Sequence, residues 1–212
     1  MKEYHKIQTV FKRDPDTKFK SLLEGGYSLP EFAFLAQNQW VYTEKVDGTN
    51  IRIQWTGTDV RFEGKTDQAQ LPSPLVRRLQ DLFLPQKERF QNQFPEGNVC
   101  FYGEGYGPKI QKVGSLYRQD QDFVLFDIRI GPWWLQRPDI EAIASKFGLR
   151  VVPILGEGTL PQLVDQVRTG FDSTWGAFPA EGIVARPKLE LTSRNGSRII
   201  TKLKHRDFLH NT

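Results

Sequence analysis

The chain has 212 residues with 38% hydrophobic and 12% aromatic side chains. This length and composition exclude a disordered protein and supply enough chain for one sizeable core. A single cysteine, Cys100, excludes an internal disulfide, so we expect a reducing compartment. No run approaches the roughly 20 apolar residues of a membrane span, and the first residues lack the apolar stretch of a secretory signal. We therefore expect a cytoplasmic protein without a membrane partner.

The net charge of +4 is unevenly distributed along the chain. Residues 185–212 contain seven basic and two acidic side chains, a local balance of +5, so the other 184 residues sum to −1. A basic segment beside a nearly neutral body is typical of a protein that binds a phosphate-rich partner. A merely solvated basic tail explains the same pattern equally well.

Strands are predicted where apolar and polar residues alternate or where short apolar runs occur. In residues 50–56, Ile51, Ile53 and Trp55 alternate with polar side chains, and residues 60–62 form the pairing strand across a turn at Gly57. The run 123–128 is typical of a strand covered on both faces. The remaining predicted strands are 99–102, 182–185 and 199–204.

Three helices are predicted between these strands, each with an apolar stripe at helical spacing. The first begins at a Ser73–Pro74 cap, the second runs from Pro138 to a stop at Gly148, and the third spans 161–168 and ends at Gly170. Hairpins imply antiparallel sheets, so the fold class is α+β. The absence of a repeat or an evident linker predicts one domain over residues 1–212.

The hexapeptide 45–50 places Lys45 two residues before an Asp-Gly pair and five before Asn50. Alone, the pattern most often marks a surface turn beside a solvated lysine. Its companions change that interpretation, because further motifs follow in a fixed order. They occupy residues 62–67, 101–107, 123–128, 181–186 and 202–208.

This ordered set resembles the nucleotidyltransferase motifs of ATP-dependent polynucleotide ligases and mRNA capping enzymes, and it is most similar to the phage RNA-ligase-2-like family. The resemblance implies a nucleotidyltransferase (adenylation) domain of antiparallel sheets flanked by helices, ATP-grasp-like in architecture. It also implies RNA joining, as in RNA repair. AMP from ATP would be attached to Lys45, passed to a 5′-phosphate and displaced by a 3′-hydroxyl. A minimal DNA ligase, or a nucleic-acid-binding module with a relict nucleotide pocket, is the alternative.

Covalent catalysis by a lysine needs positive charge nearby, because a free lysine amine is almost fully protonated at neutral pH. Lys202 and Lys204 lie two apart on a predicted strand, so both side chains point to one face. There they could favour the neutral amine of Lys45 and bind nucleotide phosphates. The alternative is an ordinary solvated strand face.

The resemblance also implies roles for other residues. Glu104 would contact the ribose, and Glu181 would hold a divalent metal, Mg²⁺ or Mn²⁺, or the attacking amine. Phe126 would stack on adenine, with Phe123 as the alternative. A regular strand would place Phe126 with Val124, Ile128 and Ile130, a pattern equally typical of plain core. The complete predicted nucleotide-binding set is Glu44, Lys45, Val46, Asn50, Lys65, Glu104, Phe126, Glu181, Lys202 and Lys204, with Asn50 and Glu181 as metal ligands.

Two departures from the family pattern affect the predicted substrate contacts. Lys65 stands where the family commonly has an arginine, and an ammonium cannot reproduce a guanidinium fork; Arg61 is a possible substitute. The chain stops shortly after Lys204, so we expect no additional C-terminal domain. The predicted partner is RNA or nicked nucleic acid, bound through phosphates by a monomer. The Trp133–Trp134 pair is expected to be buried rather than to stack on bases.

Overall fold

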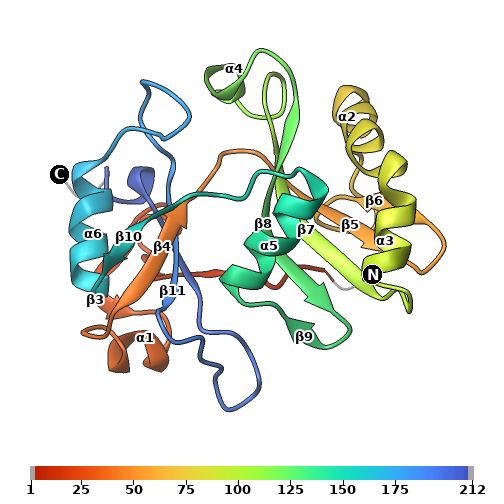
Figure 1. Ribbon diagram of the computed structural model, residues 1–212. Helices are drawn as coiled ribbons and strands as arrows, with labels where there is room; N and C mark the ends of the chain where they lie inside the picture. Colours follow the sequence, from red (N-terminus) through yellow and green to blue (C-terminus); the bar gives the residue numbers. More distant parts are fainter. Residues whose placement is uncertain (1–2, 210–212) are drawn as a thin grey trace. The chain divides into compact units, whose positions relative to one another are not determined.

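The computed structural model describes residues 3–209 and divides the chain into two compact units. Unit 1 contains residues 47–152 and the N-terminal residues up to His5; unit 2 contains residues 6–46 and those from 153 onward. The chain therefore passes between units after His5, Val46 and Val152 (Figure 1). Since both units draw on distant parts of the sequence, no single cut separates them, and the single domain over 1–212 stays a prediction.

Unit 1 is built on a five-stranded antiparallel sheet in the order β6-β5-β7-β8-β9. Its strands are β5 (Thr49–Trp55), β6 (Val60–Glu63), β7 (Val99–Tyr106), β8 (Asp122–Ile130) and β9 (Trp133–Trp134). Its helices are α2 (Ser73–Phe83), the 3₁₀ turn η1 (Leu84–Gln86), α3 (Lys87–Gln93), α4 (Gly114–Tyr117) and α5 (Arg137–Phe147).

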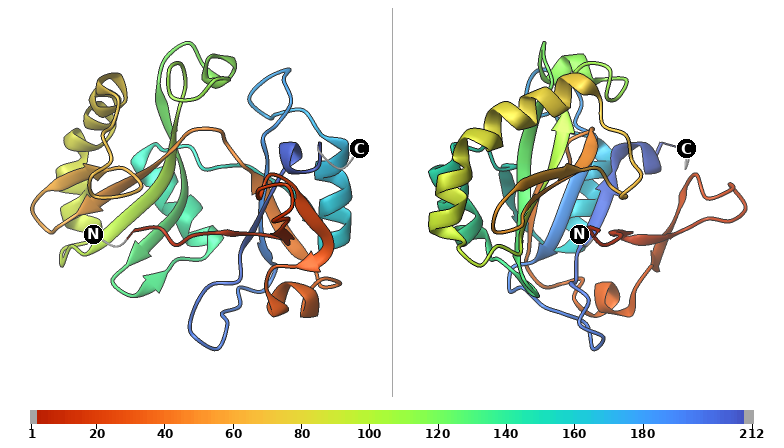
Figure 2. Two further views of the ribbon diagram at one scale, coloured as in Figure 1. Left: turned by 180° about the vertical axis from the view of Figure 1, so that it is seen from behind. Right: turned by 90° about the vertical axis from the view of Figure 1, so that its right-hand side faces the viewer.

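The core of unit 1 lies between one face of this sheet and the helices α2, α3 and α5 (Figure 2). Alternation along β5 directs Ile51, Ile53 and Trp55 into this core, where Trp55 stacks on Phe90 with ring centroids 5.4 Å apart. Burying each such side chain contributes about 1.5–3 kcal/mol. We call the opposite face of the sheet the second face; alternation gives it the polar residues of β5 and β7.

Unit 2 contains a second five-stranded sheet, in the order β1-β12-β11-β4-β10, and a separate β2-β3 pair. Among the described residues of unit 2, only the β1-β12 strand pairing is parallel. The strands are β1 (Gln8–Thr9), β2 (Phe11–Arg13), β3 (Leu22–Tyr27), β4 (Trp40–Glu44), β10 (Ile154–Gly158), β11 (Gly182–Pro187) and β12 (Thr201–Lys204). The helices are α1 (Pro30–Phe34), α6 (Leu160–Thr169) and the 3₁₀ turn η2 (His205–Asp207).

One face of the unit 2 sheet packs against α6, whose buried residues join Trp40, Ile183 and Leu203 in a common core. The helix begins with a capping box between Thr159 and Gln162, which satisfies backbone groups that a helix start leaves unpaired. Because this face is apolar, the alternating residues of β4, β11 and β12 are directed to the other face. That face carries the predicted lysines.

The α+β prediction is confirmed, and all six predicted strands and three predicted helices occur in the structure. Several boundaries were wrong. The strand predicted over 99–102 continues to Tyr106, and the last strand begins at Thr201 rather than at 199. Pro72, not Ser73, precedes α2, and no side chain caps that helix. No helix within residues 3–209 is long and apolar enough to cross a membrane.

A β-bulge in β8 overturns the predicted environment of Phe126. Tyr102 pairs with Asp127 and Gly103 pairs with Leu125, so Phe126 is an extra residue in its strand. The bulge reverses the alternation: Ile128 joins Leu125 in the core between sheet and helices, and Phe126 does not. The prediction that Phe126 shares a face with Ile128 and Ile130 was wrong for this reason.

Candidate active site

Lys45, Glu181 and Lys204 meet in unit 2, and we call these three residues the lysine cluster. The Glu181 carboxylate accepts from Lys45 Nζ through Oε2 at 2.5 Å and pairs with Lys204 Nζ through Oε1 at 2.6 Å. Sheet pairing fixes their backbones, because Lys45 N donates to Gly182 O at 2.9 Å and His205 N donates to Glu181 O at 3.0 Å. Residues 136 positions apart are thereby joined into one ionic group.

The lysine cluster is only slightly exposed to water. The side chains of Lys45, Glu181 and Lys204 are 21%, 11% and 14% exposed. Partial burial strengthens attraction between opposite charges but makes an unpaired charge costly. One carboxylate therefore partly offsets two ammonium groups. Lys202 lies on the same strand face as Lys204, as predicted, since the intervening Leu203 is buried.

Glu44 and Val46, on either side of Lys45, are both buried. The Glu44 carboxylate accepts from the Ser173 hydroxyl, from Thr174 N at 2.8 Å and from Thr174 Oγ1 at 2.7 Å. Glu44 thus anchors the loop at 173–174 to the end of β4. Both carboxylate oxygens are used within the protein, which identifies a structural task that sequence reasoning did not assign to Glu44.

The Asp47–Gly48 pair is a bend between β4 of one sheet and β5 of the other, not the turn of a hairpin. It packs tightly against β7: a Cβ atom placed on Gly48 would lie 2.2 Å from the Gly105 carbonyl oxygen and 2.8 Å from Glu104 Cγ. Only a glycine permits this approach without a shift of the backbone. The requirement for Gly48 is therefore steric.

Asn50 and Glu104 lie directly opposite each other in β5 and β7, on the second face of unit 1. Both are half-buried. The Asn50 Oδ1 atom is buried and, within the described part of the chain, has no hydrogen-bond partner. A buried carbonyl oxygen without a donor costs free energy, so this atom is suited to accept from a ligand or to contact a hard metal ion.

Lys65 is exposed in a loop that a buried arginine organises. Arg52 has no exposed surface; its Nε donates to Gly64 O at 2.7 Å, and its Nη2 donates to Asp67 Oδ1 at 2.8 Å and lies 3.1 Å from Glu63 Oε2. The hydrogen bond from Arg52 holds the pKa of Asp67 below its usual range. The sequence showed Arg52 only as a polar residue in an alternating strand, which gave no sign of this role.

Phe126 lies beneath an N-terminal side chain that sequence reasoning also missed. The Tyr4 ring meets the Phe126 ring edge-on, with centroids 5.0 Å apart, and Tyr4 OH donates to the buried Asp127 carboxylate at 2.5 Å. Phe123, the alternative, is 2% exposed and packs in the core against Phe83. Of the two phenylalanines, Phe126 is therefore the one that retains accessible surface. Trp133, expected to be buried, is 73% exposed.

The predicted site residues thus form two sets. Unit 2 carries Glu44, Lys45, Val46, Glu181, Lys202 and Lys204, and unit 1 carries Asn50, Lys65, Glu104 and Phe126. Within residues 3–209 no group of three or more His, Cys, Asp or Glu side chains could hold a metal. Mg²⁺ and Mn²⁺ prefer oxygen ligands, and Mg²⁺ uses few protein carboxylates when a polyphosphate supplies the other oxygens. Asn50 Oδ1 fits that demand, whereas the Glu181 oxygens are engaged by lysines.

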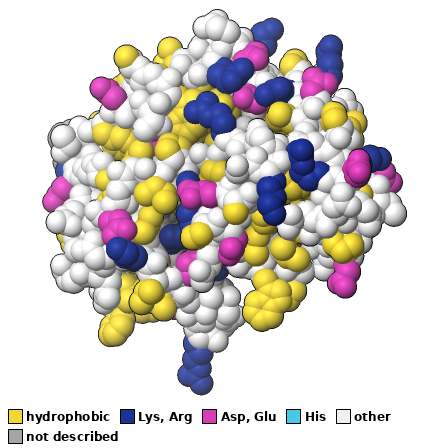
Figure 3. Space-filling model, viewed as in Figure 1, with side chains coloured by type: hydrophobic (Ala, Val, Ile, Leu, Met, Phe, Trp, Pro, Cys, Tyr) yellow, Lys and Arg dark blue, Asp and Glu magenta, His cyan; other side chains and the backbone are white. Residues whose placement is uncertain are grey.

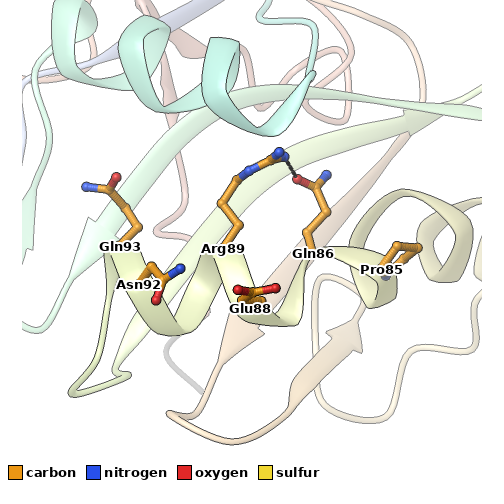
Figure 4. Close-up of a pocket in the computed structure, with 6 residues that line it drawn as sticks. All are labelled: Pro85, Gln86, Glu88, Arg89, Asn92 and Gln93. Carbon is orange, nitrogen blue, oxygen red and sulfur yellow. Dashed lines mark hydrogen bonds between the residues drawn. The ribbon is translucent and has the colours of Figure 1, made fainter.

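Two open hollows in unit 1 contain none of the predicted site residues. One, of about 550 Å³, is lined by residues of η1 and α3 alone, and its Arg89 donates to Gln86 (Figure 4). The other, of about 430 Å³, lies beside Phe94 and Ile143. Neither hollow is lined by a lysine, so neither offers a nucleophilic amine like that of the lysine cluster.

The basic segment 185–212 is partly neutralised by ion pairs. Arg186 lies 3.2 Å from Glu190, Lys188 lies 2.7 Å from Glu157, and Lys204 is paired with Glu181. On the surface drawn in Figure 3, basic and acidic side chains are interspersed without a large area of one sign. Acidic side chains outside the segment, Glu157 and Glu181, therefore offset part of its formal charge of +5.

Comparison with known proteins identifies the family. The RNA ligase family matches residues 38–204, a range that contains every predicted site residue. No curated protein matches the chain significantly. Solved structures of Naegleria gruberi RNA ligase share the fold: one with pyrophosphate has a TM-score of 0.67 and 17% identity, covering 100% of this chain and 58% of that one. A mutant with AMP and manganese has a TM-score of 0.66 and 18% identity, covering 86% and 54%.

The present chain thus spans little more than half the length of these solved structures. Their likeness supports the nucleotidyltransferase-like fold predicted from the ordered motifs. The family match extends from β4 to the end of β12. The chain therefore belongs to the RNA ligase family.

Proposed function

We propose that this protein is an ATP-dependent RNA ligase that forms a covalent lysyl-AMP intermediate at Lys45. The observation that carries the proposal is the lysine cluster, in which Glu181 holds the Lys45 amine at 2.5 Å and a second ammonium, Lys204, on its other oxygen. Family membership supports it, as do the ATP and AMP complexes of Naegleria gruberi RNA ligase. The proposed partner is RNA with a 3′-hydroxyl and a 5′-phosphate end.

In the first step Lys45 Nζ, once deprotonated, attacks the α-phosphorus of ATP. A nitrogen–phosphorus bond forms, the bond to the bridging oxygen breaks, and pyrophosphate leaves. Glu181 accepts the hydrogen bond from Lys45, so it is placed to orient the amine and to pass its proton to solvent. Lys204 lies on the same carboxylate, where its positive charge is placed to stabilise the negative charge on the phosphates.

In the next steps a 5′-phosphate oxygen attacks the phosphorus of lysyl-AMP, which returns the amine to Lys45. A 3′-hydroxyl oxygen then attacks the activated 5′-phosphate, the phosphodiester forms, and AMP leaves. The proposed nucleotide contacts in unit 1 are Asn50, Lys65, Glu104 and Phe126, and those in unit 2 are the lysine cluster, Lys202 and the backbone of Glu44 and Val46. A divalent ion would neutralise phosphate charge, with Asn50 Oδ1 as its proposed protein contact in unit 1.

The test is incubation of the pure protein with α-labelled ATP or GTP, followed by denaturation. We expect a label on the protein from ATP that survives denaturation at neutral or alkaline pH but is released by acid, as a nitrogen–phosphorus bond requires, and none when Lys45→Ala is used. Lys188→Ala is the control, because this lysine is exposed and pairs with Glu157 in the same unit. Undiminished labelling of the Lys45 variant would contradict the proposal. Joining of matched RNA and DNA nicks decides the substrate, since a preference for all-DNA nicks would identify a DNA ligase.

A further inference from the structure

The loop between β7 and β8, residues 107–121, holds the turn that follows Lys45. Asp47 N donates to Tyr117 OH at 3.1 Å, and Gln111 Nε2 donates to Gly48 O at 2.9 Å. Both bonds lie within unit 1. Tyr117 is 70 residues from Asp47 along the chain, so these contacts are tertiary features that no local sequence pattern predicts.

Close backbone packing, a hydrogen bond and two ion pairs fix the conformation of the loop. A Cβ on Gly114 would lie 1.9 Å from Gly107 O, which shows that the middle of the loop touches its first residue backbone to backbone. Gln121 Nε2 donates to Pro108 O at 2.7 Å. The buried Asp122 lies 3.1 Å from Arg118 and 2.9 Å from Arg78 of α2, which ties the end of the loop to the core helix.

This framework holds Tyr117 in a buried position within unit 1. Tyr117 is only 5% exposed, and the centroids of the Tyr117 and Tyr106 rings lie 5.9 Å apart. The buried, packed ring therefore holds the Tyr117 hydroxyl beside the Asp47 amide, from which it accepts a hydrogen bond. Gln111, in contrast, is exposed, so its bond to Gly48 is made at the surface.

The turn is consequently restrained from two directions. Gly105 and Glu104 of β7 fill the space beside the Gly48 Cα, and the loop contributes two hydrogen bonds to the adjacent backbone. Lys45 lies only two residues before Asp47 in the chain. Fixing Asp47 and Gly48 therefore restrains the backbone that continues directly from Lys45.

We propose that Tyr117 and Gln111 are positioning residues for the nucleophile, and that the loop 107–121 acts as a clamp on the Asp47–Gly48 turn. This inference rests on the proposed function, because it assigns the clamp to the lysyl-AMP step. Formation of the nitrogen–phosphorus bond needs accurate placement of the amine, whereas binding of ATP and the final attack of the 3′-hydroxyl do not use Lys45 as a nucleophile. The clamp should therefore affect one step selectively.

The test separates the steps in Tyr117→Phe, which removes the hydroxyl and keeps the packed ring, and in Gln111→Ala, which changes an exposed side chain. We expect lysyl-AMP formation at saturating ATP to slow about fivefold in each variant, the scale of one lost hydrogen bond. The KM for ATP and the sealing of chemically pre-adenylylated RNA should change by less than about twofold, because neither depends on the placed amine. Tyr27→Phe and Gln91→Ala are matched controls outside the loop.

Two results would overturn the clamp. One is labelling at the parental rate in both variants while Lys45→Ala stays unlabelled, which would refute the clamp and leave the proposed function intact. The other is an equal loss in labelling, KM and sealing of pre-adenylylated RNA, which would reveal a general structural defect. Labelling of Lys45→Ala would contradict the proposed function itself, whereas parental labelling of the two loop variants would contradict only the clamp. The two failures are therefore distinguishable.

Discussion

The lysine cluster of unit 2 and the second face of unit 1 differ in whether their buried polar groups are paired. In the cluster, one carboxylate is bonded to two ammonium groups, and all three side chains are mostly buried. On the second face, Asn50 leaves a buried oxygen without a hydrogen-bond partner among the described residues. An ion-paired group must lose its partner before it can react or bind a ligand, whereas an unpaired acceptor can bind a ligand directly. Under the proposed function, unit 2 carries the nucleophile and unit 1 carries an oxygen suited to accept from a ligand.

The largest expected effect distinguishes Glu181 from Glu104. We expect Glu181→Ala to lower the rate of self-adenylylation at saturating ATP by two or more orders of magnitude, because a placed electrostatic group next to the nucleophile is lost. Glu104→Ala should instead act mainly through a raised KM for ATP, as a ribose contact would. Rate measurements over a range of ATP concentrations separate the two effects.

Glu157→Ala is the control for both glutamate variants, since Glu157 is an exposed partner of Lys188. If Glu181→Ala and Glu104→Ala change KM and maximal rate in the same proportions, the division of labour between the two regions is wrong. It would then be necessary to treat both glutamates as parts of one electrostatic group.

A smaller effect is expected from Gly48→Ala, at the bend that links the two regions along the chain. The new Cβ would lie 2.2 Å from Gly105 O, so the backbone must move. Overpacking of this kind costs about 1–3 kcal/mol. We expect a lower melting temperature and at least roughly tenfold slower lysyl-AMP formation, because the displaced turn also displaces Lys45. Parental labelling by this variant would show that the turn does not control the nucleophile.

Tyr4→Phe tests the second face with a more modest change. The variant leaves the buried Asp127 carboxylate without the hydrogen bond from Tyr4 OH but retains the ring against Phe126. Loss of a hydrogen bond to a charged group costs about 1.5–3 kcal/mol. Chemical denaturation should reveal this loss, with the maximal rate of labelling unchanged. A slower maximal rate with unchanged stability would instead connect Tyr4 to the chemistry.

The last test leaves the activity of the protein unchanged and concerns the reactivity of Cys100, which lies on the second face and is 7% exposed. Burial raises the pKa of its thiol from 9.0 to about 11, so the thiol stays protonated at neutral pH. The raised pKa contributes stability below pH 9, and this contribution is lost as the pH rises through about 11. Iodoacetamide at pH 8 should react at least about 100-fold more slowly with the native than with the unfolded protein. Equal rates would show that this face is open to water.

Local patterns in the sequence accounted for much of the fold. Alternation in residues 50–56 and the apolar stripes of α5 and α6 depend on neighbours within a few positions, and the structure confirms them. The bulge at Phe126 could not be predicted, because it arises from the register between β7 and β8 rather than from the composition of either strand. Glu44 shows the same limit: its partners Ser173 and Thr174 lie about 130 positions away.

By itself the sequence determined the RNA ligase family, the α+β class and the identity of Lys45, Glu104, Glu181 and the two C-terminal lysines as candidates, because ordered motifs and strand periodicity are written in consecutive residues. Only the tertiary structure decided that Glu181 bridges Lys45 and Lys204, that Arg52 organises the loop of Lys65, and that Tyr117 reaches Asp47. Such contacts form when sheet pairing and core packing bring distant residues together, and their geometry depends on side-chain reach and burial that no short segment encodes.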